Sequence, residues 1–170
     1  MTIKAQDVKA LREKTGLGMM ECKKALQEAD GNLDDAIKNL RKSSALKAEK
    51  KASRTAVEGV ILSKLSDKEI IFVEVNCETD FVAKNDDFLN FVKELSEINN
   101  QCSSDIDKLN KSVMDNGKTV EENLVALIAK IGEKITIGKR STIENSNSQN
   151  FIYQHSVIKD NVSKLCVVVS

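Results

Sequence analysis

The amino-acid sequence predicts an α+β fold, in which a helical N-terminal module precedes an antiparallel β-sheet packed with helices. Apolar residues recur with a helical period up to about residue 40, whereas runs of β-branched residues begin at Val57. The charge changes in the same region, because residues 1–56 hold 13 basic and 8 acidic side chains, a net charge of +5. Residues 57–170 hold 13 basic and 18 acidic side chains, a net charge of −5. We therefore expect two modules.

Residues 1–40 are expected to form a small three-helix bundle. Gly16 and Gly18 mark the turn after the first amphipathic segment, and Asn32 is placed to cap the third helix, with Asp35 completing a capping box. The second helix presents a recurrent apolar face, made of Met19, Cys22, Ala25, Leu26 and Ala29. A bundle of this size is marginal alone and typically serves as a docking module.

Residues 41–56 form a basic connector, with six basic residues and one acidic residue. Alanine and lysine favour a helix, but no apolar face is present, so the segment is either a helical extension or an exposed linker. A basic run without aromatic residues is typical of a solvated segment, and we expect no direct contact with nucleic acid.

Residues 57–170 are expected to form the α+β core. The run that breaks the second strand, residues 77–85, comes before a helix, and residues 100–118 are polar enough to be a surface excursion. Thr119 and Glu122 form a capping box for a later helix. The expected elements are strands over 57–65 and 69–76, helices over 86–99 and 119–133, and strands over 135–143, 150–159 and 162–169. Because the last strand pattern runs to the end of the sequence, we expect either a truncated chain or a final strand that closes the sheet.

Composition and motifs exclude several classes of protein. A zero net charge argues against a dedicated nucleic-acid binder, and 31% charged residues argue against a membrane protein. The N-terminus lacks a signal peptide, so a cytoplasmic protein is expected, bacterial in the first instance, with an organelle matrix as the other location. The four cysteines are scattered and His155 is the single histidine, so we expect no metal and no other cofactor. Nucleotide-binding and hydrolase motifs are missing, which predicts that the protein is not an enzyme.

The residues with the clearest functional signal are Thr79, Asp80, Phe81 and Val82. A strand ends there, and an acid and a phenylalanine stand together in a predicted loop before a helix. In one interpretation Phe81 packs beneath its own loop and Asp80 caps the backbone locally. In the other, the pair forms an exposed wedge, in the manner of an interface hot spot. Only 4% of the residues are aromatic, which makes a phenylalanine in a loop informative.

Several separated motifs resemble the translation elongation factor Ts family, the guanine nucleotide exchange factors for elongation factor Tu. The order and spacing of these motifs agree along the whole chain, although residues 86–118 match only in pattern. The motifs are LREKTGLGMMECKKAL at 11–26, LKAEKKA at 46–52, VEVNCETDFVAKN at 73–85, IAKIGEK at 128–134 and YQH at 153–155.

The resemblance implies a role for each motif. The N-terminal bundle is similar to a ubiquitin-associated domain and would dock on the G domain of elongation factor Tu. The matching positions are Met19, Met20 and Lys23, although the helical spacing of Met19 also suits a core residue.

The Thr79–Val82 stretch corresponds to the family's motif for dislodging the partner's magnesium ion. Ile131 and Gly132 fall in a second contact region, and His155 matches a histidine near the part of the partner that holds its phosphate loop. Ile131 also suits a core position, and His155 also suits an ordinary strand surface.

The resemblance thus predicts a guanine nucleotide exchange factor that binds elongation factor Tu and promotes GDP release. The alternative is a ubiquitin-associated-like adaptor that binds a protein or the ribosome without exchange activity. Longer family members continue into a second half of the core, and this chain ends where that half begins. Two options follow, a truncated member or a naturally short member that works as a homodimer.

Overall fold

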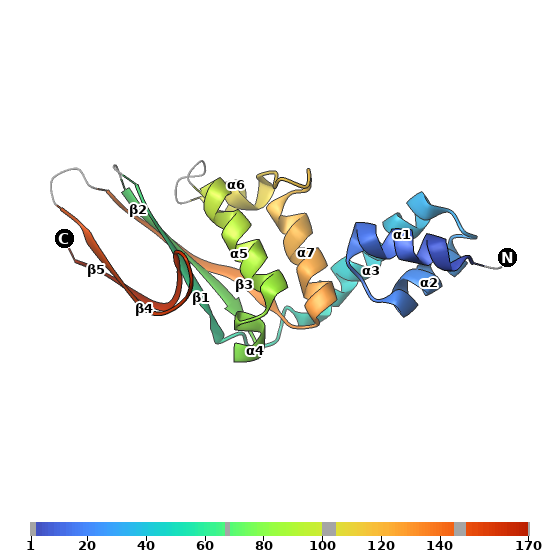
Figure 1. The fold of residues 1–170 in the computed structure, drawn as a ribbon, viewed down its shortest axis with the longest axis horizontal. Coiled ribbons are helices and arrows are strands. Elements are labelled where there is room, and N and C mark those ends of the chain that lie inside the picture. The colour runs from blue at the N-terminus through green and yellow to red at the C-terminus, as the bar shows by residue number, and fades with distance from the viewer. Residues whose placement is uncertain (1–2, 67–68, 100–104, 145–148, 170) are drawn as a thin grey trace. The chain divides into compact units, whose positions relative to one another are not determined.

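The computed structural model describes residues 3–66, 69–99, 105–144 and 149–169 (Figure 1). The fold is α+β, as predicted, with N-terminal helices followed by an antiparallel sheet packed with helices. The chain divides into two compact units. The first unit comprises Met1–Ser53 and Val125–Glu133, and the second comprises Arg54–Leu124 and Lys134–Ser170.

The first unit contains helices α1 (Ala5–Thr15), α2 (Met19–Glu28) and α3 (Leu33–Lys51). Gly16 ends α1 with a φ of 70°, a left-handed conformation that glycine adopts without steric cost. The Asn32 side chain accepts hydrogen bonds from the N–H groups of Asp34 and Asp35 at 3.0 and 3.2 Å, which confirms the predicted cap of α3. The helices enclose a buried cluster of Val8, Leu11, Leu17, Cys22, Ala25, Leu26, Ala36 and Leu40.

The basic connector is helical over most of its length. Helix α3 continues through the basic run to Lys51, so the helical extension, rather than an exposed linker, describes residues 41–51. Ser44 is buried at 5% exposure, whereas Arg41 and Lys42 are exposed. Lys50 is exposed as well, whereas Lys47 and Lys51 are half-buried.

The second unit is built on an antiparallel sheet. Its strands are β1 (Glu58–Leu65), β2 (Glu69–Cys77), β3 (Ile135–Glu144), β4 (Phe151–Lys159) and β5 (Val162–Val169). Within the described residues, five strands follow the order β3-β2-β1-β5-β4. Strand β5 lies between β1 and β4, so β4, and not the last strand, forms that edge. The expected closing strand is thus an interior strand.

The pairing differs along the sheet. Strands β1 and β2 are in register from Glu58↔Cys77 to Leu65↔Ile70. Strands β1 and β5 pair only near Ile61↔Ser163, and the β4–β5 hairpin continues beyond that contact. The hairpin therefore depends mainly on its own ladder of hydrogen bonds.

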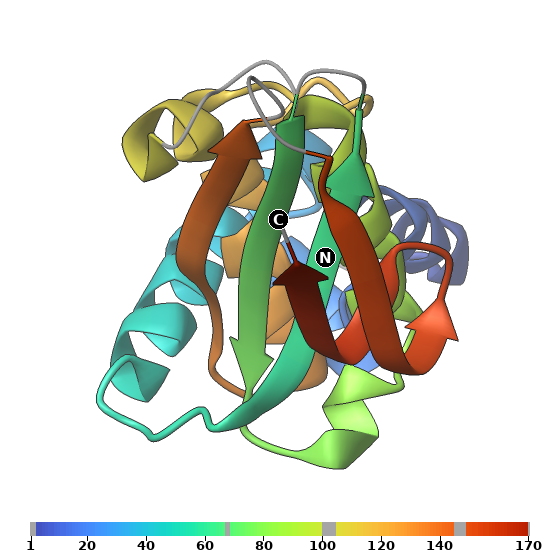
Figure 2. The ribbon, with the colours of Figure 1, turned by 90° about the vertical axis from the view of Figure 1, so that its left-hand side faces the viewer.

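Helices cover one face of this sheet (Figure 2). Helix α5 (Asp86–Asn99) has the predicted bounds, and it contacts β1. Its buried residues include Phe88, Leu89, Phe91, Val92 and Leu95. Burial of each such side chain contributes about 1.5–3 kcal/mol relative to exposure. Together with the inward residues of β1 and β2, they form the core of the second unit, and that core supports the end of β2.

Two helices refine the sequence prediction. Helix α7 (Val120–Ile131) starts at the predicted capping box, in which Thr119 N–H donates to Glu122 at 2.9 Å and Glu122 N–H donates to Thr119 at 3.1 Å. The helix ends at Ile131, because Gly132 has a φ of 88°. The prediction of a surface excursion over residues 100–118 was partly wrong, because helix α6 (Ile106–Lys111) buries Leu109 completely. Residues 100–104 lie outside the described part of the chain.

No helix among the described residues is long and apolar enough to cross a membrane.

Replacement of Gly59 by alanine is expected to destabilise the second unit. Gly59 pairs with Asn76 at a φ of 148°, and a Cβ there would lie 2.2 Å from the Val75 carbonyl oxygen. We expect a loss of more than about 2 kcal/mol in the free energy of unfolding, measured by urea titration. Gly18→Ala is the control, because nothing lies within 4 Å of its Cβ position. Equal stability of the two variants would contradict the close approach of β1 and β2.

Candidate functional site

The residues that follow β2 form a single helical turn and not the predicted loop. Helix α4 spans Asp80–Ala83, and Thr79 is its N-cap in an extended conformation. The Thr79 hydroxyl accepts a hydrogen bond from Val82 N–H at 3.4 Å, and the Thr79 carbonyl accepts one from Ala83 N–H at 3.2 Å. These hydrogen bonds therefore fix the backbone of residues 79–83, between β2 and α5.

Exposure separates the side chains of α4 into two sets. Phe81 is 81% exposed, the highest fraction among the large hydrophobic residues that the structure describes. Val82 is 7% exposed and Ala83 is fully buried. The interpretation in which Phe81 packs beneath its own loop is therefore wrong. Val82 was predicted with the contact residues, but it faces the interior and anchors the turn instead.

Asp80 forms an ion pair within the turn and does not act mainly as a backbone cap. Its carboxylate lies 2.9 Å from the Lys84 ammonium, at i,i+4 spacing. The hydrogen bond and positive charge of Lys84 lower the pKa of Asp80 below its ordinary value, and the charge of Lys164 adds to this. Asp80 therefore keeps its negative charge near neutral pH.

Two further residues beside the turn were not singled out by the sequence reasoning. Lys84 pairs with Asp80, and its i,i+4 spacing from that acid was a visible signal. Glu78 precedes Thr79 and accepts hydrogen bonds from Arg54 and from the backbone of Lys134. No local sequence pattern indicates these contacts, because they join residues far apart in the sequence.

The candidate residues of the first unit are accessible. Met19 is 60% exposed and Met20 is 75% exposed, so the alternative in which Met19 is a core residue is wrong. Lys23 is also exposed on α2. Helical spacing alone placed Met19 on the inner face, but the helix has only just begun there and the bundle does not cover it.

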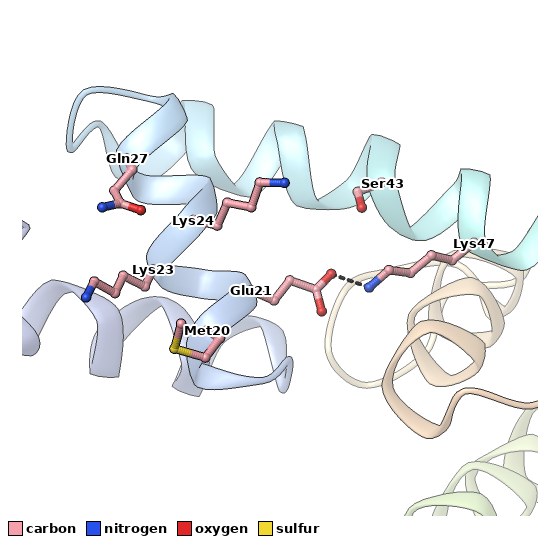
Figure 3. A pocket seen from close by; sticks show the side chains of 7 residues that line it. All are labelled: Met20, Glu21, Lys23, Lys24, Gln27, Ser43 and Lys47. Carbon is pink, nitrogen blue, oxygen red and sulfur yellow. Dashed lines mark hydrogen bonds and ion pairs between the residues drawn. The ribbon is translucent and has the colours of Figure 1, made fainter.

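A shallow groove of about 610 Å³ runs between α2 and α3 (Figure 3). Glu21 and Lys47 form an ion pair between the two helices. Three lysines and one glutamate line this groove, so its charge suits an acidic surface. Met20 lies at the end of the groove and offers an apolar contact to the same surface. Its lining residues are Met20, Glu21, Lys23, Lys24, Gln27, Ser43 and Lys47.

Ile131 and Gly132 lie at the end of α7, within the first unit. Ile131 is half-buried, and Gly132 is exposed with its positive φ. The Gly132 carbonyl accepts a hydrogen bond from the Lys51 ammonium. Termination of α7 is sufficient reason for the glycine, so the local structure gives no separate sign of a contact role.

His155 lies on the exposed side of β4. Its Nδ1 is 3.0 Å from the Tyr153 hydroxyl, and both side chains are exposed. The cross-strand pairs of the β4–β5 hairpin place apolar neighbours beside it on the same face. These exposed neighbours are Phe151, Tyr153, Leu165, Val167 and Val169.

The two units thus divide the predicted contact residues. The α4 turn and His155 belong to the second unit, whereas Met19, Met20, Lys23 and the end of α7 belong to the first. Within the described residues, no group of three or more His, Cys, Asp or Glu side chains is arranged to hold a metal ion.

Comparison with known proteins gives one consistent result. A family model described as Elongation factor TS matches residues 78–170. Elongation factor Ts of Hydrogenovibrio crunogenus is 49% identical over 158 residues, covering 91% of this chain and 53% of that protein. Elongation factor Ts of Rickettsia bellii is 42% identical over 169 residues, covering 99% of this chain and 54% of that protein. The chain spans about half the length of these curated relatives.

Replacement of Lys84 by methionine is expected to raise the pKa of Asp80 toward its ordinary value. Because the folded-state pKa is lowered, the pair stabilises the turn above the unfolded-state pKa and loses this effect as pH falls through the folded-state value. A carboxyl-detected NMR titration measures the change. Lys93→Met, at an exposed position on α5, is the control. Identical Asp80 titrations in the two variants would contradict the pairing.

Proposed function

Because the chain belongs to the elongation factor Ts family, we propose that it acts as a guanine nucleotide exchange factor, binding elongation factor Tu and promoting the release of GDP. The proposal extends to this half-length chain an activity that the family resemblance implies. The observation that supports it most directly is the exposure of Phe81 on a fixed helical turn.

An exposed phenylalanine on a fixed backbone is suited to act as a wedge. Burial of such a ring in a partner gains about 1.5–3 kcal/mol relative to water. Val82 and Ala83 hold the turn from beneath, so Phe81 is free to insert between helices of the partner. Insertion then displaces the partner's elements and not those of this chain.

The wedge would act on the partner's nucleotide site indirectly. GDP is held by backbone N–H groups and by Mg²⁺ that bridges phosphate and protein. A shift of the elements that position the ion weakens both the Mg²⁺ bridge and the backbone hydrogen bonds to GDP. The Asp80 carboxylate, which is ionised near neutral pH, favours the shifted state when it meets a helix N-terminus of the partner.

Exchange then follows from thermodynamic linkage. A protein that binds the nucleotide-free partner more tightly must weaken the partner's hold on nucleotide by the same factor. No covalent bond is made or broken, so the activity requires no catalytic dyad.

The first unit would supply affinity in this scheme. Met20 and Lys23 line the groove between α2 and α3, where an apolar side chain and a positive charge lie together. An acidic surface of the G domain fits these contacts. We therefore assign docking to the first unit and the wedge to the second.

The adaptor alternative depends on the same groove. If residues 1–56 were the whole functional surface, the chain would bind a protein or the ribosome without affecting nucleotide release. The exposed turn of the second unit favours exchange over this alternative, because an adaptor has no use for it.

Replacement of Phe81 by alanine is expected to slow stimulated release of fluorescent GDP from elongation factor Tu. Loss of a central aromatic anchor commonly costs about 2 kcal/mol, or about thirtyfold. Phe151→Ala is the matched control, since Phe151 is 60% exposed in the same unit. Because neither ring is buried, both variants should keep the wild-type melting temperature. Wild-type release by the Phe81 variant would refute the wedge.

Replacement of Lys23 by glutamate is expected to raise the concentration of this chain needed for half-maximal release, by about tenfold, with little change in the maximal rate. Lys42→Glu changes the net charge equally at another exposed site and is the control. Titration of the release rate measures both quantities. A lower maximal rate with an unchanged half-maximal concentration would contradict the docking role.

A further inference from the structure

The carboxylate of Glu78 joins three segments of the second unit at the base of the α4 turn. Glu78 lies between the end of β2 and Thr79, and its side chain is only 20% exposed. One guanidinium nitrogen of Arg54 lies 3.3 Å from each carboxylate oxygen. The backbone N–H of Lys134, one residue before β3, donates to the same carboxylate.

A third hydrogen bond closes this arrangement. The Lys134 ammonium donates to the Arg54 carbonyl oxygen at 2.8 Å. Arg54, Glu78 and Lys134 therefore form a closed ring of contacts, which we call the Glu78 clamp. Charge-assisted hydrogen bonds of a mostly buried carboxylate are stronger than those of an exposed ion pair.

The clamp adds to the contacts that hold the start of the turn. The Thr79 hydroxyl accepts a hydrogen bond from Val82 N–H at 3.4 Å, and the Thr79 carbonyl accepts one from the Cys77 thiol at 3.2 Å. Glu78 is bonded directly to Thr79, so fixing its side chain also restricts the backbone at the start of the turn. Val82 and Ala83 fix the opposite end by burial.

We propose that Glu78 is a positioning residue for exchange, which holds the α4 turn so that Phe81 and Asp80 project at a fixed angle. The inference rests on the proposed exchange function and adds to it a residue that need not touch the partner. Its effect passes through the backbone of Thr79 and the clamp partners.

Glu78→Ala is the direct test, with two readouts on the full chain. The maximal rate of stimulated GDP release should fall about tenfold, with the half-maximal concentration unchanged within about twofold, because positioning acts in the complex and not on docking. Amide hydrogen exchange of Val82 and Ala83 in the free chain should quicken about tenfold as the turn loosens.

Glu74→Ala is the matched control. Glu74 is a carboxylate within β2, four residues before Glu78, and it accepts hydrogen bonds from Lys139 N–H at 3.3 Å and Asn76 Nδ2 at 2.9 Å. These partners lie on β2 and β3 and not in the turn, so loss of Glu74 should leave both readouts near wild type. Glu78→Gln keeps an acceptor for Lys134 N–H without the charge, and should restore part of each readout.

The outcomes separate this inference from the wedge itself. If the Glu78→Ala variant matched the Glu74→Ala variant in either the maximal release rate or the amide exchange, the positioning role would be overturned. If Glu78→Ala failed to fold, Arg54→Ala, which removes only the half-exposed guanidinium, would carry the same two tests. A Phe81→Ala variant with wild-type release would refute the wedge, while amide exchange would still decide whether Glu78 holds the turn.

Discussion

An aromatic ring stays in water only if something other than the ring holds its backbone, and this constraint governs the region after β2. Phe81 contributes little packing energy to the fold, since it is 81% exposed. The turn must therefore be stabilised by its neighbours. Val82 and Ala83 supply burial, Thr79 supplies a cap, and Glu78 ties the entry to two distant segments. The sheet and α5 matter to the site because they make these anchors rigid.

Much of the fold followed from periodicity and capping chemistry. The bounds of α5 and the caps at Asn32 and Thr119 were predicted correctly, because each depends on residues close together in the sequence. Helices α4 and α6 were missed, since four or six residues are too few to show a helical period. The place of β5 inside the sheet was also missed. The residue pattern of a strand indicates which of its side chains are buried, but it does not indicate which other strand pairs with it.

The candidate residues were found through family resemblance more than through physics, and the structure sorts them. Phe81 could be read either way from the sequence, and its exposure decides between the two interpretations. Met19 shows the limit of periodicity at a helix end, where the spacing of a core face continues beyond the core. Glu78 escaped notice because its partners, Arg54 and Lys134, are distant in the sequence.

The rigid α4 turn also has a consequence for the thermodynamics of association. The backbone entropy of residues 79–83 is lost when the chain folds, so complex formation need not remove it a second time. A wedge on a mobile loop would lose that entropy at every encounter and would meet its partner in many shapes. In the mechanism that we propose, a prefolded turn would present one shape to each successive partner molecule. The free energy of ring burial would then remain available for deforming the partner, instead of ordering the turn.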